Sequence, residues 1–230
     1  ATRDADGVLF TRAGLEIGVA ATKTFVSQVA AMYLLALRLA EVRATLPAER
    51  VTALVADLRG LPHLIQRLVD EADGPAQAMA EHWREAGFFL YLGRHAGLAT
   101  ALEGALKLKE ISYVPTDAYA AGEMKHGPIA LLDERTPVVV VATESPVLDK
   151  VLSNIAEVRA RGAHVLAVAT EGDATVAEHA EEVLYVPRTD WLLQPLLAVI
   201  PLQLLAYHIA RGRGLNVDQP RNLAKTVTVE

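Results

Sequence analysis

Apolar residues recur at helical spacing through the first third of the chain. Between Thr22 and Arg43 they fall on one helix face, at Phe25, Val29, Met32, Ala36 and Leu39. Three shorter helical stretches follow, at 48–58, at 63–72 and from Gly74-Pro75 to about Glu85. The pattern predicts an almost entirely helical first third, which glycine and proline divide into separate helices.

From Gly87 onward, short apolar runs alternate with helical stretches. Four runs have the length and apolar content of buried strands: "FFLYLG", "PVVVVAT", "HVLAVAT" and "VLYVP". The helical stretches of this part lie at 98–113, 147–161 and 192–211. Such alternation is typical of an open parallel sheet flanked by helices, so we predict an α/β fold that a mostly helical segment precedes.

Composition narrows the function classes. The chain has 52% hydrophobic residues, a net charge of −6 and no cysteine. The acidic balance argues against a nucleic-acid partner. The lack of cysteine excludes disulfides, thiolate metal sites and a cysteine nucleophile, and makes a cytosolic (cytoplasmic) location the simple expectation. Arg38 interrupts the first apolar helix before the ~20 residues that a bilayer requires, so we expect no membrane segment. The seven histidines show no ligand spacing, so we expect no metal site.

One predicted helix carries charged residues on a single face. Glu103, Lys107 and Glu110 are spaced i, i+4 and i+7, whereas Lys109 points away. This helix begins at the carboxyl end of a predicted strand, where open α/β sheets bind ligands. Gly104, which costs about 1 kcal/mol relative to alanine in mid-helix, indicates a close approach of another group. A catalytic face and a solvated stripe of salt bridges are both compatible with this spacing.

Three further segments could carry chemistry. The glycines of "GRHAGLAT" would let backbone N–H groups approach an anion. In "AAGEMKHGP", His126 could be a general acid or base, or could only complement the dipole of a helix end. In the final "RNLAKTVTVE", alternating residues could hold the tail extended and deliver Lys225 into a pocket; a solvated surface lysine is the alternative.

Six segments resemble, in order, those of one family: "GLEIGVAATKTF", "ALEGALKLKEISY", "AYAAGEMKHGPIAL", "LSNIAEVRARG", "IPLQLLAYHIARGRG" and "DQPRNLAKTVTVE". They are similar to the isomerase part of the glutamine–fructose-6-phosphate aminotransferases, and the resemblance covers nearly the whole chain. It implies two sugar-isomerase (SIS) domains, each a parallel sheet flanked by helices. It also implies an enzyme that converts fructose 6-phosphate and glutamine-derived ammonia into glucosamine 6-phosphate.

The resemblance implies a role for each catalytic candidate. Lys225 matches the lysine that forms a Schiff base with the C2 carbonyl of the sugar. Glu110 matches the base that moves a proton between C1 and C2. His126 matches the residue that opens the sugar ring, which a neighbouring subunit contributes, and Lys107 matches a lysine that assists proton handling. These residue types suit isomerisation without a metal, because a carboxylate can carry the proton and an iminium acidifies it.

The resemblance also implies substrate contacts and partners. Val19 and Ala224 match positions whose backbones contact the substrate, and Ala21 lies where relatives often have serine. A homodimer is implied, without metal or redox cofactor. The loops that grip the sugar phosphate, and a glutaminase domain, would precede residue 1, so we expect a piece of a longer protein that is inactive in glutamine-dependent synthesis by itself.

Under this resemblance the chain divides into four parts. Residues 1–45 end a first SIS domain, 46–86 form a helical connector, 87–215 form a second SIS domain and 216–230 form an active-site tail. Two alternatives remain from the sequence: an SIS deglycase that cleaves fructosamine phosphates, and a non-catalytic SIS module that senses sugar phosphates. The sensor would not need Lys225, Glu110 and His126 together.

Overall fold

The computed structural model describes residues 2–225, and the alternation predicted for residues 226–229 lies outside this range. The chain begins with an extended segment and ends with a tail after α6. Between them lie, in order, α1 (Lys23–Val42), α2 (Ala48–Trp83), β1 (Phe89–Gly93), α3 (Ala96–Ser112), β2 (Thr116–Ala120), the 3₁₀ helices η1 (Ala121–His126) and η2 (Pro128–Leu131), β3 (Pro137–Ala142), α4 (Leu148–Arg159), β4 (His164–Thr170), α5 (Ala174–Ala177), β5 (Glu182–Val186) and α6 (Gln194–Gly212).

The strands form one parallel sheet in the order β2-β1-β3-β4-β5. The predicted open α/β sheet is therefore confirmed. The strand order reverses direction between β1 and β3, and such a reversal places a crevice at the carboxyl ends of these strands. α3 starts at this edge, directly after β1. The face predicted to be catalytic, with Glu103, Lys107 and Glu110, lies further along this helix.

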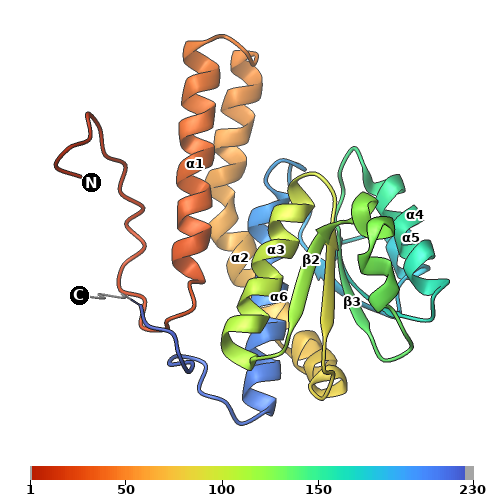
Figure 1. Ribbon diagram of the computed structural model, residues 1–230. Coiled ribbons are helices and arrows are strands. Elements are labelled where there is room, and N and C mark those ends of the chain that lie inside the picture. Colours follow the sequence, from red (N-terminus) through yellow and green to blue (C-terminus); the bar gives the residue numbers. More distant parts are fainter. Residues whose placement is uncertain (1, 226–230) are drawn as a thin grey trace.

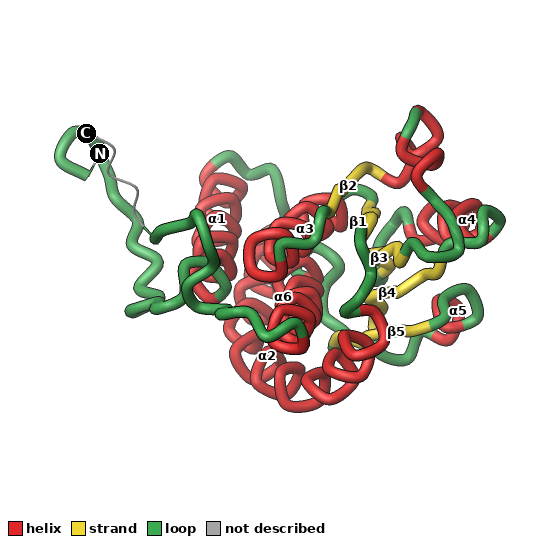
Figure 2. The backbone as a smooth tube through the Cα atoms, turned by 60° about the horizontal axis from the view of Figure 1, so that its bottom comes forward, coloured by secondary structure: helices red, strands yellow, loops and turns green. Residues whose placement is uncertain are grey.

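Helices cover both faces of the sheet (Figures 1 and 2). α2, α3 and α6 cover one face and pack on Tyr91, Val139 and Leu166. α4 and η1 lie on the other, against Leu90 and Val140. Because neighbouring strand residues point to opposite faces, both faces need apolar side chains. This explains why the strands read as continuous apolar runs in the sequence.

Residues 48–83 form a single helix, so the prediction of three separate helices is wrong. Pro62 and Pro75 lie inside α2, although an interior proline costs about 3 kcal/mol. The helix changes direction along its length (Figure 1), as prolines cause it to do. Its buried face offsets this cost through packing, with Leu54, Leu61, Leu68, Ala72, Ala76, Met79, Ala80 and Trp83. Burying each large side chain contributes about 1.5–3 kcal/mol.

One strand and one α-helix of the described chain were not predicted from the sequence, and neither were the 3₁₀ helices η1 and η2. β2 has the short sequence "TDAYA" and is mostly half-buried, because it forms an edge of the sheet and pairs with β1. An edge strand does not need the apolar run by which the inner strands were recognised. α5 has only four residues, and the Asp173 side chain caps its first turn. Neither leaves a periodic pattern long enough to detect.

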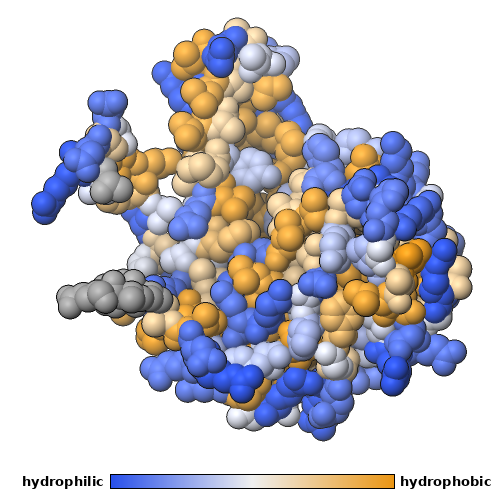
Figure 3. Space-filling view, in the orientation of Figure 1, coloured by the Kyte–Doolittle hydropathy of each residue, from blue (hydrophilic) through white to orange (hydrophobic). Residues whose placement is uncertain are grey.

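α1 projects with the first half of α2 away from the sheet (Figure 1), and apolar side chains line its surface (Figure 3). Ala31 and Leu37 are its buried residues, whereas Met32, Leu34, Leu35, Leu39 and Val42 are exposed. By length and composition alone α1 could cross a membrane, with a mean hydropathy of 1.5 and 11% of the apolar window buried. One arginine in the helix was therefore insufficient reason to set this possibility aside.

Changing Gly93 to alanine is expected to lower the free energy of unfolding by about 2–3 kcal/mol. A Cβ atom at Gly93 would lie 2.2 Å from the carbonyl oxygen of Gly97 and 2.6 Å from the nitrogen of Leu98. Both are backbone atoms, so relief requires a shift of β1 or α3. Urea unfolding measures the loss, with Gly87→Ala as control because nothing lies within 4 Å of a Cβ there. Equal stability of the two variants would contradict the steric argument.

Candidate active site

Lys107 lies between two carboxylates on α3. Its Nζ is 2.6 Å from Glu110 Oε2 and 3.4 Å from Glu103 Oε1. The side chains are 5%, 23% and 10% exposed for Lys107, Glu110 and Glu103. Such burial excludes the solvated stripe of salt bridges, while Lys109 is exposed, as predicted. The helical spacing thus brings an ammonium group and two carboxylates together inside the protein.

Burial shapes the electrostatics of this cluster. It raises the pKa of Glu103, an effect that Lys107 opposes and that the neighbouring charge of Glu110 reinforces. Gly104 has a packing reason, because a Cβ there would lie 2.6 Å from Leu202 Cδ1 and 3.1 Å from Tyr91 Cε1. The close approach inferred from this glycine therefore joins α3 to α6 and β1. Tight packing fixes the direction in which the charged face points.

Lys225 is anchored on the segment that precedes α1. Its Nζ donates to Glu16 Oε2 at 2.6 Å, to the carbonyl of Gly18 at 2.9 Å and to that of Val19 at 3.5 Å. The tail also approaches this segment through its backbone, since Val19 N–H donates to the Asp218 carbonyl at 2.9 Å. Lys225 is thus an ordered residue of the described chain and not a freely solvated lysine.

Glu16 receives several hydrogen bonds besides the one from Lys225. Thr22 N–H donates to Oε1 at 2.9 Å and Thr24 Oγ1 donates to Oε2 at 2.5 Å. Its side chain is 6% exposed. Burial alone would raise the pKa of Glu16, but the bonds from Lys225, Thr24 and Thr22 outweigh this and lower it to about 2. Glu16 is therefore a buried anion whose charge is paired with Lys225.

Acid should release Lys225 only at very low pH. The pKa of Glu16 is lowered from 4.5 to about 2, so the carboxylate stabilises the folded state above pH 4.5. This stabilisation, on the order of 3 kcal/mol, is lost as the pH falls from about 4.5 towards 2. An NMR titration of the Glu16 carboxyl carbon should have its midpoint near 2, and a midpoint at the unfolded value would contradict the contacts described here.

A pocket of about 400 Å³, called here the tail pocket, connects the two groups of residues. It is lined from the amino-terminal segment, α3, α6 and the tail, by Leu15, Glu16, Ile17, Gly18, Ala20, Thr22, Lys23, Lys107, Ile111, Gln203, Tyr207, Val217 and Asp218. Two of these lining residues form ion pairs with predicted site residues: Glu16 pairs with Lys225, and Lys107 pairs with Glu110. Gln203 Nε2 is buried without a hydrogen-bond partner among the described residues.

The remaining predicted site residues lie at different distances from this pocket. Val19 and Ala21 belong to the same segment as the lining residues and are half-buried, and Ala224 is exposed beside Lys225. His126 ends η1, with a side chain that is 74% exposed and lies 3.9 Å from Glu123 Oε2. It does not line the tail pocket of its own chain. The structure therefore places Lys107 and Glu16, the partner of Lys225, in the lining of one pocket, whereas Lys225, Glu110 and His126 are not among its described lining residues.

The turn into α3 does not present the anion site that its glycines suggested. The N–H groups of Gly97 and Leu98 donate to the carbonyls of Arg94 and His95. Steric contact explains both glycines, because a Cβ at Gly97 would lie 3.3 Å from Val141 Cγ1. Among residues 2–225, no cluster of histidine, aspartate and glutamate has the geometry of a metal site.

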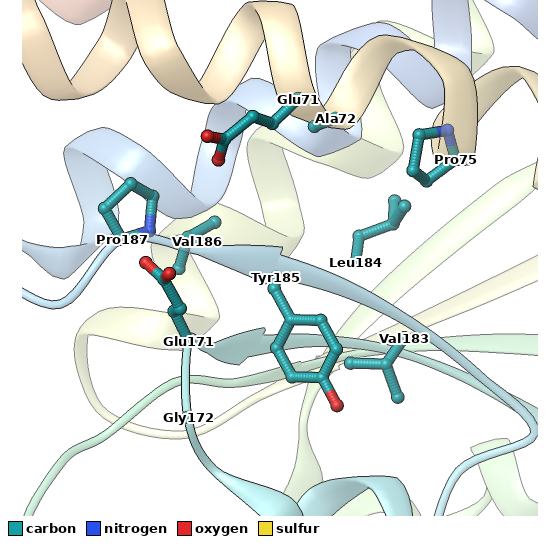
Figure 4. Close-up of a pocket in the computed structure, with 10 residues that line it drawn as sticks. All are labelled: Glu71, Ala72, Pro75, Glu171, Gly172, Val183, Leu184, Tyr185, Val186 and Pro187. Carbon is teal, nitrogen blue, oxygen red and sulfur yellow. The ribbon is translucent and has the colours of Figure 1, made fainter.

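A second pocket, of about 320 Å³, lies between α2 and β5 (Figure 4). Glu71 and Pro75 project from α2 above the strand that bears Tyr185, and Glu171 lies at its rim. Glu171 pairs with Arg67 at 2.9 Å. The described residues that line this pocket include neither lysine nor histidine. It therefore cannot supply an amine nucleophile, and the tail pocket is the better candidate site.

Sequence reasoning missed three residues around the tail. Glu16 binds Lys225, Asp218 joins the tail to Val19, and Tyr113 accepts a hydrogen bond from Arg221 N–H at 2.7 Å. Glu16 and Lys225 are 209 positions apart. No local pattern marks a pair at that separation, whereas the face of α3 could be found from its period.

The chain is similar to proteins of one known family. The SIS domain family profile covers residues 84–211. Over 229 residues the chain is 53% identical to the glutamine–fructose-6-phosphate aminotransferase of Thermus thermophilus, covering all of this chain and 38% of that protein. It is 52% identical to the enzyme of the same name from Methanosarcina acetivorans, covering all of this chain and 37% of that protein. The chain thus spans well under half the length of these relatives.

Solved structures give the same result. The C-terminal domain of glucosamine-fructose-6-phosphate aminotransferase from Francisella tularensis has a TM-score of 0.89 and 36% identity, over 95% of this chain and 61% of that one. Glucosamine-6-phosphate deaminase from Thermotoga maritima has a TM-score of 0.66 and 26% identity, over 94% of this chain and 59% of that one. The resemblance inferred from the six segments is confirmed, and the chain belongs to the SIS domain family, as a relative of the C-terminal isomerase part of these aminotransferases.

Proposed function

We propose that this chain is the isomerase part of a longer aminotransferase that makes glucosamine 6-phosphate from fructose 6-phosphate and ammonia released from glutamine. One observation carries the proposal: Lys225 is anchored on Glu16 at the tail pocket, which also contains Lys107, the ion-pair partner of Glu110. The names of the relatives support the choice of substrate.

The chemistry follows from these groups. The Lys225 amine adds to the C2 carbonyl of the open sugar and water leaves, which gives an imine. Ammonia adds to C2 of this imine and the Lys225 amine leaves, which frees Lys225 and gives a C2 imine that carries the ammonia nitrogen. This imine acidifies the hydrogen on C1, and the Glu110 carboxylate takes that proton and returns it at C2, so that C1 becomes the aldehyde and C2 carries the amine. Lys107 pairs with Glu110 at 2.6 Å and so fixes the position of its carboxylate. Gln203 Nε2, which has no hydrogen-bond partner among residues 2–225, is a suitable donor for a sugar hydroxyl.

His126 is proposed to act in the tail pocket of a neighbouring subunit of a homodimer. Its exposure supports this arrangement, as does the fact that it is not among the described residues that line the tail pocket of its own chain. There it would protonate the ring oxygen and open the sugar ring. Sedimentation tests the assembly: a chain that stays monomeric at every accessible concentration cannot share a site in this way.

The exposed apolar face of α1 belongs to the same proposal. Under the predicted division, residues 1–45 end a first SIS domain, and its sheet would cover Met32, Leu35 and Leu39. A cytoplasmic protein would then need no membrane for α1, since the upstream domain removes these side chains from water.

Titration with fructose 6-phosphate followed by borohydride reduction tests the function. Binding by this chain should be weak, with a Kd above about 1 mM, because the phosphate-gripping loops of the family would lie before residue 1. Borohydride should nevertheless attach the sugar covalently to Lys225 at high sugar concentration. Binding without attachment would favour the sensing module. Release of free sugar phosphate from a fructosamine phosphate would favour the deglycase.

A further inference from the structure

The tail after α6 is held at three successive points. Asp218 accepts a backbone hydrogen bond from Val19, Arg221 N–H donates to the Tyr113 hydroxyl, and Lys225 Nζ donates to Glu16. The first and last contacts reach the segment before α1, and the middle contact reaches the end of α3. Residues from both ends of the chain and from α3 thus meet around the tail.

Tyr113 contacts the tail through both its hydroxyl and its ring. It caps α3 in the left-handed region, with φ of 62°, and its N–H donates to the Lys109 carbonyl. A residue with a Cβ in this region carries a modest strain that other contacts must offset. Its hydroxyl accepts from Arg221 N–H at 2.7 Å, and the Arg221 guanidinium lies 4.3 Å from the ring centroid. One side chain therefore holds both the backbone and the charge of Arg221.

Glu16 fixes the far end of the same stretch. It is the only carboxylate among the described residues that contacts Lys225. Its Oε2 also accepts from Thr24, and its Oε1 from Thr22, so the carboxylate cannot turn away without losing bonds to α1 and its approach. A charge held by several short hydrogen bonds positions its partner better than a free surface carboxylate does.

We propose that Glu16 and Tyr113 are positioning residues that dock the tail and place the Lys225 amine at the tail pocket. The proposal rests on the proposed function in taking Lys225 as the imine-forming amine. Tyr113 terminates the helix that bears Glu110, so docking there fixes the tail relative to the proton-transferring carboxylate. Glu16 keeps the amine at the pocket when no sugar is present, and the incoming carbonyl must draw it away.

Pulsed acetylation of lysines, read residue by residue by mass spectrometry, tests the docking in this chain. Lys109 is exposed on α3 and serves as the internal reference. Glu16→Gln keeps the shape of the side chain and removes its charge, so the labelling of Lys225 relative to Lys109 should rise about fivefold or more. Tyr113→Phe keeps the ring under Arg221 and removes the acceptor, so a rise of about twofold is expected.

The matched control is Glu171→Gln, which removes the carboxylate partner of Arg67 on a distant surface and should leave Lys225 labelling unchanged. Lys107, which is 4% exposed, reports general loosening of the fold. A rise at Lys225 without a rise at Lys107 supports docking. Unchanged labelling in Glu16→Gln, or an equal rise at Lys107, overturns it. If labelling changes as expected but the parent chain forms no sugar adduct with borohydride, docking stands and the proposed function fails.

Discussion

Changing Lys225 to alanine or to arginine is expected to reduce the borohydride-trapped sugar adduct to below about 1% of that formed by the parent chain. Only a primary amine can form the imine, and neither replacement has one. Arginine is the informative variant, because its guanidinium can still pair with Glu16 and hold the tail in place. The adduct is quantified by mass spectrometry after digestion, at several concentrations of fructose 6-phosphate.

Lys125→Ala is the control for this experiment. Lys125 is an exposed amine that pairs with Glu157 at 2.8 Å, away from the tail pocket, so its loss should leave the adduct unchanged. Persistence of the adduct in Lys225→Arg would show that another lysine reacts. Lys23, whose Nζ donates to the Leu15 carbonyl at the pocket edge, would be the first to examine.

Changing Lys107 to methionine is expected to lower the free energy of unfolding by about 3–5 kcal/mol at pH 7. The side chain is 5% exposed and lies between Glu103 and Glu110. Methionine fills similar volume but leaves two buried carboxylates without their cation. Lys109→Met, on the exposed face of the same helix, should change stability by less than about 0.5 kcal/mol. Urea unfolding of both variants measures the difference.

The pH dependence separates lost charge pairing from lost packing in Lys107→Met. Burial already raises the pKa of Glu103 with Lys107 present, and loss of Lys107 removes a group that lowers it. A carboxyl group with a raised folded-state pKa binds its proton more readily in the folded chain, so its protonation favours folding below that pKa and this gain is lost as the pH rises. The destabilisation should therefore shrink as the pH falls from 7 towards 4.5. A deficit that does not change with pH would indicate a packing defect.

The inner strands could be predicted because both of their faces are buried. β1, β3 and β4 are nearly fully buried, and their uninterrupted apolar residues mark them in one dimension. β2 could not be found in this way, because an edge strand made of "TDAYA" depends on its pairing with β1. Likewise, Pro62 and Pro75 were expected to end helices, yet packing along the face of α2 keeps that helix continuous.

The candidate site was also predictable only in part from the sequence. The period of a helix is sufficient to predict that Glu103, Lys107 and Glu110 lie on one face. The position of Lys107 in a pocket was not evident from that period, because the segment before α1, α6 and the tail supply the other lining residues. The role of His126 stays a prediction, since this residue lies away from that pocket.

The pattern of residues close together in the sequence was thus sufficient to predict the α/β class, the main strands and the charged face of α3. Each of these depends on neighbours within a few turns or residues. Contacts across the folded molecule decided the rest: the continuity of α2, the edge strand β2 and the docking of Lys225 on Glu16, 209 positions away. The physical reason is that apolar periodicity records which side of an element is buried, whereas the partner on the other side of the interface leaves no mark at that position in the sequence.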